Sequence, residues 1–223
     1  MNTSPKGGFI MSKLILFQGD SITDCGRSRD GDGYLGCGYP RLVEAALGFE
    51  APNEYQFINR GISGNRIVDV YARIKADIIN LKPDYLSIYI GVNDVWHELG
   101  SKNGVATPKF EKIYSMLLEE VMEACPETKI FLIAPFVIKG HGTYNAEDTS
   151  YYEAFVKDVN TKIEAVKRVG EKFALPVIEL QPAFDEALKL ADDKYWTADG
   201  VHPTAKGHEL IKRLWLETFE KIN

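Results

Sequence analysis

Short apolar runs alternate with amphipathic stretches along this chain. Five runs have the length and composition of buried strands: Leu14–Gln18, Tyr55–Asn59, Tyr85–Ile90, Lys129–Ala134 and Val177–Leu180. Between them, apolar residues recur every three or four positions, which predicts helices over about 67–78, 110–122, 155–166 and 210–219. Strands that alternate with helices are typical of βαβ units, in which the strands are parallel and the crossovers right-handed.

Five such strands predict an α/β fold, with a five-stranded parallel sheet between two layers of helices in an α/β/α sandwich. Pro83 and Pro176 precede two of the strands, where each would end a preceding helix. No linker, repeat or low-complexity segment interrupts the pattern, so we expect one domain over residues 12–223. Met11 is an alternative start, and we interpret residues 1–11 as a tail.

Composition excludes several classes of function. The 223 residues carry a net charge of −6, which argues against a nucleic-acid or anionic-membrane surface. No apolar stretch approaches the roughly 18 residues that cross a bilayer, and the N-terminus lacks the apolar region of a secretory signal. The three cysteines form no CxxC pair, so we expect no metal site. Their odd number and the lack of a secretory signal predict reduced thiols in a cytoplasm.

The carboxyl ends of parallel strands are where ligands bind in open α/β sheets. Gly19-Asp20-Ser21 follows the first strand, and the glycine permits a sharp turn that would present the Ser21 hydroxyl at this edge. The loops 24–38 and 140–150 lack periodicity, and the first of them lies beside Ser21. A Gly-Asp-Ser tripeptide is also an ordinary turn sequence, so Ser21 needs partners elsewhere.

A serine nucleophile needs a base and a group that orients the base. Of the four histidines, His97 and His141 are expected in loops and His208 inside the last helix, with a packing or surface role. His202 precedes a proline and therefore lies in a turn, three residues after Asp199. The Asp199 carboxylate can reach one ring nitrogen and leave the other free for Ser21, although the same pattern also occurs in ordinary capped turns.

Attack on an ester also needs donors for the oxyanion. Gly64 lies in a loop after the second strand, where a backbone N–H can approach the reacting carbon. Asn93 follows the third strand and offers a side-chain N–H without charge. Gly64 alone could be a turn glycine, and Asn93-Asp94 a helix N-cap pair.

Substrate-binding candidates flank these segments. Asp20 precedes the serine, Trp96 follows Asn93, and Trp196 precedes Asp199, so we expect these three side chains to contact substrate. The aromatic side chains, with Tyr195, could stack on a sugar ring or simply pack in the core. Three side chains of the first loop could bind hydroxyl groups: Asp24, Arg27 and Arg29.

Four segments together resemble the four sequence blocks of the SGNH (GDSL-type) esterases and lipases. They are Gly19-Asp20-Ser21, Ile62-Ser63-Gly64-Asn65, Gly91-Val92-Asn93-Asp94 and Asp199-Gly200-Val201-His202-Pro203. The one departure is Ile22, where the family has leucine. The resemblance covers nearly the whole chain and implies a flavodoxin-like sheet of order 2-1-3-4-5.

The resemblance also implies roles. Ser21 would be the nucleophile, with its own N–H in the oxyanion hole beside the Gly64 N–H and the Asn93 side chain. His202 would be the base and Asp199 its orienting group. The resemblance implies neither a metal nor an organic cofactor.

Within that family the chain is similar to bacterial intracellular carbohydrate acetylesterases, through Gly19–Arg27, Gly61–Asn65, Asn93–Trp96 and Pro135–Ile138. The implied function is hydrolysis of short-chain acetyl esters, with O-acetyl groups on oligosaccharides as the small-molecule substrate. Some of those enzymes form large homo-oligomers, so a homo-oligomer is one alternative for this chain.

Three other functions stay open at this point. A lysophospholipase or thioesterase of the same family would have a deeper acyl pocket. A doubly wound binding or phosphorelay module could use Asp20 and Asp24, but the fifth strand leads to Gln181-Pro182 and not to the lysine that such a site needs. An inactive sugar-binding descendant would not need all five catalytic residue types, which are present here.

Overall fold

A computed structural model describes residues 12–223, and the predicted tail, residues 1–11, lies outside the described residues. One parallel sheet contains β1 (Lys13–Gly19), β2 (Tyr55–Asn59), β3 (Tyr85–Tyr89), β4 (Lys129–Ala134) and β5 (Val177–Glu179). The strand order is β2-β1-β3-β4-β5, which confirms the predicted sheet and its order. The fifth strand is one residue shorter than expected, because Leu180 begins the next helix.

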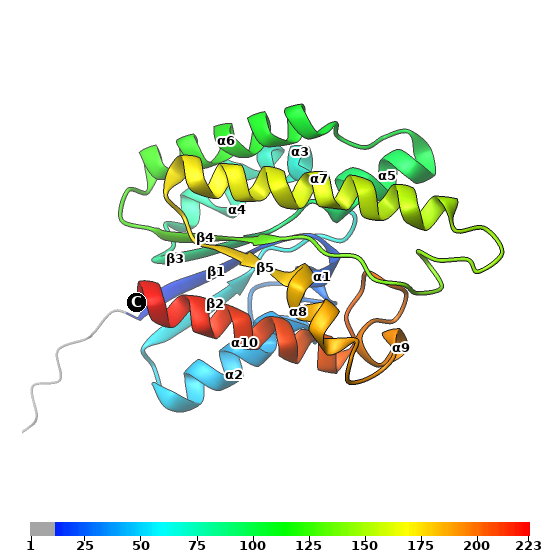
Figure 1. The fold of residues 1–223 in the computed structure, drawn as a ribbon. Helices are drawn as coiled ribbons and strands as arrows, with labels where there is room; N and C mark the ends of the chain where they lie inside the picture. The colour runs from blue at the N-terminus through cyan, green and yellow to red at the C-terminus, as the bar shows by residue number, and fades with distance from the viewer. Residues whose placement is uncertain (1–11) are drawn as a thin grey trace, which may run out of the picture.

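Helices cover both faces of the sheet (Figure 1). One face carries α3 (Ile67–Ala72), α4 (Ile74–Asp77), α5 (Val92–Ser101), α6 (Thr107–Ala124) and α7 (Ser150–Phe173), with a 3-10 turn over Ile79–Leu81. The opposite face carries α2 (Tyr39–Glu50) and α10 (Ala205–Ile222). Three short helices lie toward the carboxyl edge: α1 (Ser21–Asp24), α8 (Leu180–Ala187) and α9 (Asp193–Trp196). The α/β/α sandwich is therefore confirmed.

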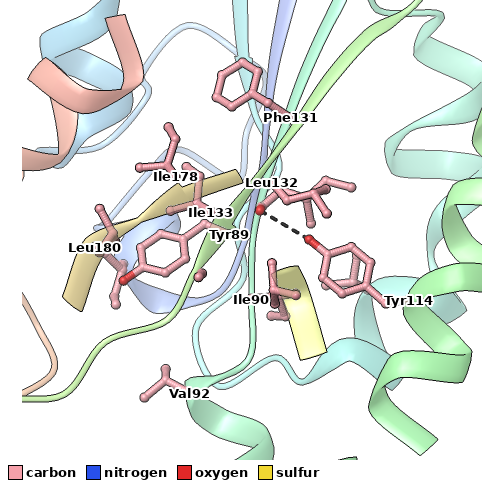
Figure 2. Packing of buried hydrophobic residues seen from close by; sticks show 14 of the residues in the cluster. Tyr89, Ile90, Val92, Tyr114, Phe131, Leu132, Ile133, Ile178 and Leu180 are labelled. Carbon is pink, nitrogen blue, oxygen red and sulfur yellow. Dashed lines mark hydrogen bonds between the residues drawn. The ribbon is translucent and has the colours of Figure 1, made fainter. Parts of the chain in front are cut away.

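The sheet interior is apolar on both sides, as a parallel sheet covered by helices requires. All five residues of β3 are buried. Figure 2 shows Tyr89, Ile133 and Ile178 together on one side of the strands, where the strand register places them next to one another. Tyr114 of α6 packs from the other side, and its hydroxyl donates to the Ile88 carbonyl at 3.4 Å. This packing fixes the strands whose carboxyl ends carry the site.

The predicted continuous helix over 67–78 is wrong. It is divided at Arg73, whose φ of −111° and ψ of 14° end α3 and begin α4. The Arg73 guanidinium is drawn toward the sheet and donates to Gln18 Oε1 at 2.6 Å, the Arg60 carbonyl at 2.7 Å and Asn65 Oδ1 at 2.9 Å. These charge-assisted bonds hold the Arg73 side chain at the point where the two helices meet.

The third strand is followed by a helix and not by a long loop. Gly91, with φ of 137°, turns the chain directly into α5, so His97 lies in that helix and the loop prediction for it is wrong. Asn93 and Asp94 occupy the first turn of α5, where Gly91 is the N-cap residue.

Candidate active site

Ser21 lies where β1 meets the short helix α1. A Cβ on Gly19 would lie 2.4 Å from both the Tyr89 carbonyl oxygen and Thr23 Oγ1, so only glycine fits at the end of the strand. Asp20 is the N-cap residue of α1, and its carboxylate accepts a hydrogen bond from the Ile22 N–H at 3.0 Å. Ser21 is consequently the first residue of α1, half-buried at the carboxyl edge of the sheet.

His202 and Asp199 come to Ser21 from the turn before α10. The Ser21 Oγ lies 2.9 Å from His202 Nε2, and His202 Nδ1 lies 2.6 Å from Asp199 Oδ2. The other Asp199 oxygen accepts the backbone N–H groups of Val201 and His202, at 2.9 and 2.8 Å. The turn is therefore folded around the Asp199 carboxylate, and residues 181 positions apart form one hydrogen-bonded chain.

The pKa values of Asp199 and His202 favour transfer of the Ser21 proton to His202. Burial raises the pKa of Asp199, but hydrogen bonds from the His202 ring and from two backbone N–H groups outweigh it and lower the pKa to about 2. The hydrogen bond to Asp199 raises the pKa of His202 above its ordinary 6.5, against the opposing effect of burial. Asp199 thus stays ionised and makes His202 a better proton acceptor.

Asn93, a further predicted residue, bonds to the residue that follows Gly64. Gly64 has a φ of 80°, and a Cβ there would meet no atom within 4 Å. Asn93 is 6% exposed, and its Nδ2 donates one hydrogen to the Asn65 carbonyl at 3.1 Å. That bond fixes the amide beside the Gly64 loop and leaves its second hydrogen for another acceptor.

A contact that the sequence did not reveal joins this loop to the serine helix. The Asp24 carboxylate, at the end of α1, accepts from the Ser63 N–H at 2.9 Å and the Ser63 hydroxyl at 3.1 Å. Arg29 donates to the same carboxylate at 2.5 Å, and Arg27 donates to the Gly61 carbonyl at 2.7 Å. The Asp24 side chain is 3% exposed, and Ser63 and Arg29 already occupy its carboxylate.

The sequence from residue 17 to residue 210 matches the model of the GDSL-like lipase/acylhydrolase family. The chain belongs to this family. It is 35% identical to an acetylxylan esterase of Geobacillus stearothermophilus over 91% of both chains, and 24% identical to an uncharacterized Bacillus subtilis lipoprotein over 69% of both. Family membership confirms the resemblance seen in the sequence and makes the chain a carboxylic ester hydrolase.

Solved structures agree with this assignment. A catalytic mutant of the Geobacillus stearothermophilus acetylxylan esterase superimposes with a TM-score of 0.81 at 33% identity, over 94% of this chain and 95% of that one. An α/β hydrolase from the metagenome of Lake Arreo, Spain, gives 0.80 at 30% identity, over 95% and 96%. The chain thus shares the overall fold of these two solved hydrolases.

The two tryptophans predicted to contact substrate lie in different places in this GDSL-like hydrolase. The Trp96 ring is 5.6 Å from the Phe155 ring and 5.8 Å from the ring of His202, the residue that contacts Ser21. Trp196 instead lines a groove of about 680 Å³ between α8, α9 and α10, and none of Ser21, Asp199 and His202 lines that groove. Only Trp96 is therefore brought to the candidate site.

Asp20 is fully buried, so the structure does not expose its carboxylate at the surface. Burial raises the pKa of the Asp20 carboxyl to about 7. In the structure, Asp20 caps the N-terminus of α1 by accepting a hydrogen bond from the Ile22 N–H. The sequence could not separate this capping role from substrate binding, because Asp20 adjoins the serine in both cases.

Neither a metal cluster nor a membrane-spanning helix is found among the described residues. Within residues 12–223 no three His, Cys, Asp or Glu side chains gather in an arrangement that could hold a metal ion. Over the same residues, no helix has the length and apolar character needed to cross a membrane.

Proposed function

We propose that the chain is a serine esterase that removes acetyl groups from oligosaccharides, through Ser21, His202 and Asp199. The observation that carries the proposal is the hydrogen-bonded chain of these three side chains, with contacts of 2.9 and 2.6 Å. Similarity to an acetylxylan esterase over 91% of the chain supports the acetyl ester and the sugar.

The solved relatives support the same three residue types. Catalytic mutants of the Geobacillus stearothermophilus acetylxylan esterase replace a serine, an aspartate or a histidine by alanine. In that enzyme the aspartate and the histidine are three residues apart, as Asp199 and His202 are here.

The geometry supports a proposed role for each side chain. His202 Nε2 takes the proton as Ser21 Oγ bonds to the ester carbonyl carbon, while Asp199 holds the Nδ1–H and stabilises the imidazolium. When the tetrahedral intermediate collapses, the same proton passes to the departing sugar oxygen and leaves an acetyl group on Ser21. Water, deprotonated by His202, then attacks this acetyl ester, and acetate is released as Ser21 regains its proton.

The oxyanion of each tetrahedral intermediate needs fixed donors. We assign the Ser21 and Gly64 backbone N–H groups and the free hydrogen of the Asn93 amide to this role. The open space above Gly64 and the fixed amide of Asn93 support the assignment. A side chain at position 64 would project into the space where the ester must lie.

The test is hydrolysis of p-nitrophenyl esters of two, four, eight and twelve carbons, followed by acetylated xylo-oligosaccharides. We expect the rate to fall steeply beyond acetate and Ser21→Ala to lose about 10³-fold or more in kcat. A maximum at eight or twelve carbons would instead indicate the lysophospholipase or thioesterase alternative. Full activity of Ser21→Ala would contradict the proposed nucleophile.

A Trp96 variant tests whether the substrate carries a sugar ring that stacks on this side chain. The Trp96 ring lies beside His202, and Tyr151, which is 37% exposed, also adjoins it. Removing the stacking surface in Trp96→Ala is expected to raise KM for an acetylated oligosaccharide roughly 5-fold, from about 1 kcal/mol of ring contact. Trp196→Ala is the matched control and should leave KM unchanged, whereas equal effects of the two variants would argue against the assignment.

The proposal includes a cytoplasmic location and leaves the monomer and the homo-oligomer as alternatives. Fractionation of cells that express the full chain tests the location, and sedimentation of the purified chain tests the assembly. Neither result changes the assignment of Ser21.

A further inference from the structure

Two cysteines that the proposed mechanism does not use lie against each other beside the serine helix. The Sγ atoms of Cys25 and Cys37 are 3.2 Å apart. Cys25 is the C-cap residue of α1, and its N–H donates to the Ser21 carbonyl at 2.9 Å. The pair therefore closes the base of the loop that runs from the end of α1 to the start of α2.

Backbone contacts hold the two cysteines in this position. The Cys37 N–H donates to the Cys25 carbonyl at 2.9 Å. Gly36, with a φ of 89°, passes so close that a Cβ on it would lie 2.6 Å from the same carbonyl oxygen. A Cβ on Gly38 would lie 2.9 Å from the Cys25 Cβ. The close approach of the sulfurs thus follows from a packed backbone and not only from side-chain rotamers.

The two thiols differ in accessibility. Cys37 is exposed, whereas Cys25 is half-buried and touches His208 of α10, with Cys25 Sγ 3.5 Å from His208 Nε2. Burial and the neighbouring Cys37 sulfur raise the pKa of the Cys25 thiol to about 12. Cys37 is therefore the sulfur that an oxidant in solution meets first, and Cys25 is the sulfur placed to react next.

We propose that Cys25 and Cys37 are a reversible thiol–disulfide site that fastens the loop between them. With a peroxide, the Cys37 sulfur is first oxidised to a sulfenic acid and one water is released. The Cys25 sulfur then attacks that sulfur, the S–S bond forms, and the hydroxyl leaves as a second water with the proton of Cys25. The two thiols together lose two electrons and two protons, which reduce the peroxide to water.

Closure should disturb the serine little. The sulfurs must move from 3.2 Å to the roughly 2.05 Å of a disulfide bond. Cys37 is exposed and can move, whereas Cys25 is held by α1, Gly38 and His208. The bond therefore fastens a loop closed by residues 12 positions apart and is expected to leave esterase activity within about two-fold of the reduced enzyme.

The experiment treats the folded full chain with hydrogen peroxide, or separately with oxidised glutathione, and counts thiols before and after unfolding. We expect two of the three thiols to disappear and the mass to fall by two hydrogens. Dithiothreitol should restore both thiols. The oxidised chain should melt roughly 5–10 °C above the reduced one, from the entropy of a loop of this length.

Cysteine variants provide matched controls. Cys37→Ser and Cys25→Ser should lose both the bond and the rise in Tm. Cys125→Ser should retain both, because Cys125 is buried at the end of α6 and its Sγ contacts the Ile79 carbonyl at 3.7 Å. Cys37→Ser changes an exposed side chain, so it remains informative where Cys25→Ser fails to fold.

Three outcomes would overturn the proposal. The first is an adduct on Cys37, such as a glutathione mixed disulfide, that persists without reaction of Cys25. The second is a bond that forms equally well in Cys37→Ser. The third is a Cys25–Cys37 bond that leaves Tm unchanged, because the loop would then not be fastened. None of these readouts depends on the assignment of Ser21 as the nucleophile.

Discussion

The Asp24 carboxylate accepts two hydrogen bonds from Ser63, one from the N–H at 2.9 Å and one from the hydroxyl at 3.1 Å. Asp24 is the last residue of the helix that begins with Ser21, and Ser63 precedes Gly64. One buried side chain therefore fixes the distance between the proposed nucleophile and a proposed oxyanion donor. Although burial raises the pKa of Asp24, bonds from Arg29 and Ser63 lower it below its ordinary value, so the carboxylate stays ionised.

Asp24→Asn is expected to lower kcat on the order of 10-fold or more and to change KM less than about two-fold. The amide keeps the shape of the carboxylate, but it cannot accept from Arg29 and from both Ser63 groups as strongly, so the Gly64 loop is held less firmly. Steady-state kinetics on p-nitrophenyl acetate measure the effect.

Ser63→Ala is the matched control for that variant. It removes the hydroxyl contact and keeps the N–H contact, so it should lower kcat by a smaller factor than Asp24→Asn. If Asp24→Asn raised KM and left kcat unchanged, Asp24 would contact substrate and would not position the loop.

Asn93→Ala should lower kcat roughly 10²–10³-fold with little change in KM, because an oxyanion donor acts in the transition state and not on the bound ester. The Asn93 side chain is nearly buried and bonds to the Asn65 carbonyl, so circular dichroism and Tm must show that the variant is folded. A variant whose KM alone rose would remove Asn93 from the proposed oxyanion hole.

Contacts between residues close together in the sequence could be predicted from it. Contacts between residues that only the fold brings together could not. The His202–Asp199 contact lies within three positions, and the spacing indicated it. The Asp24–Ser63 contact joins residues 39 positions apart, and no sequence pattern predicts it. A parallel sheet brings such segments together at one edge, so the sequence predicts that they meet but not which atoms bond.

Burial is the second property that the sequence did not reveal. Asp20 and Trp196 lie close to the proposed catalytic residues in the sequence. In the structure, however, Asp20 caps the N-terminus of α1, and Trp196 lines a separate groove. The apolar period over 67–78 likewise predicted one helix. It could not reveal the break at Arg73, because the acceptors that bind the Arg73 side chain lie on distant residues.

His208 should make the folded state less stable as the pH falls from about 6.5 to about 4. Burial lowers the pKa of His208 from 6.5 to about 4, so in this window the unfolded chain binds a proton that the folded chain does not. The stability contributed by neutral His208 is present above pH 6.5 and is lost as the pH falls toward 4. At roughly 1.4 kcal/mol per pKa unit, the loss is about 3 kcal/mol.

Buried Asp20 and Asp94 have pKa values raised by burial to about 7 and about 8, and their effect on stability has the opposite sign. The measurement is therefore the difference in unfolding free energy between the wild type and His208→Gln, by urea denaturation at pH 7 and at pH 4.5. Gln keeps an acceptor for the Tyr39 N–H, which His208 Nδ1 accepts at 3.1 Å. A difference that does not change with pH would show that His208 titrates normally.

The pH profile of hydrolysis should report His202, because only the neutral ring can accept the Ser21 proton. The hydrogen bond to Asp199 is the largest cause that raises the pKa of His202 above 6.5, so the acidic limb of kcat/KM in the wild type should have its midpoint above 6.5. Activity is lost as the pH falls through that midpoint. Asp199→Asn removes the charge, so the midpoint should move to lower pH while kcat falls on the order of 10³–10⁴-fold. An acidic limb that stays in place in Asp199→Asn would show that a group other than His202 controls it.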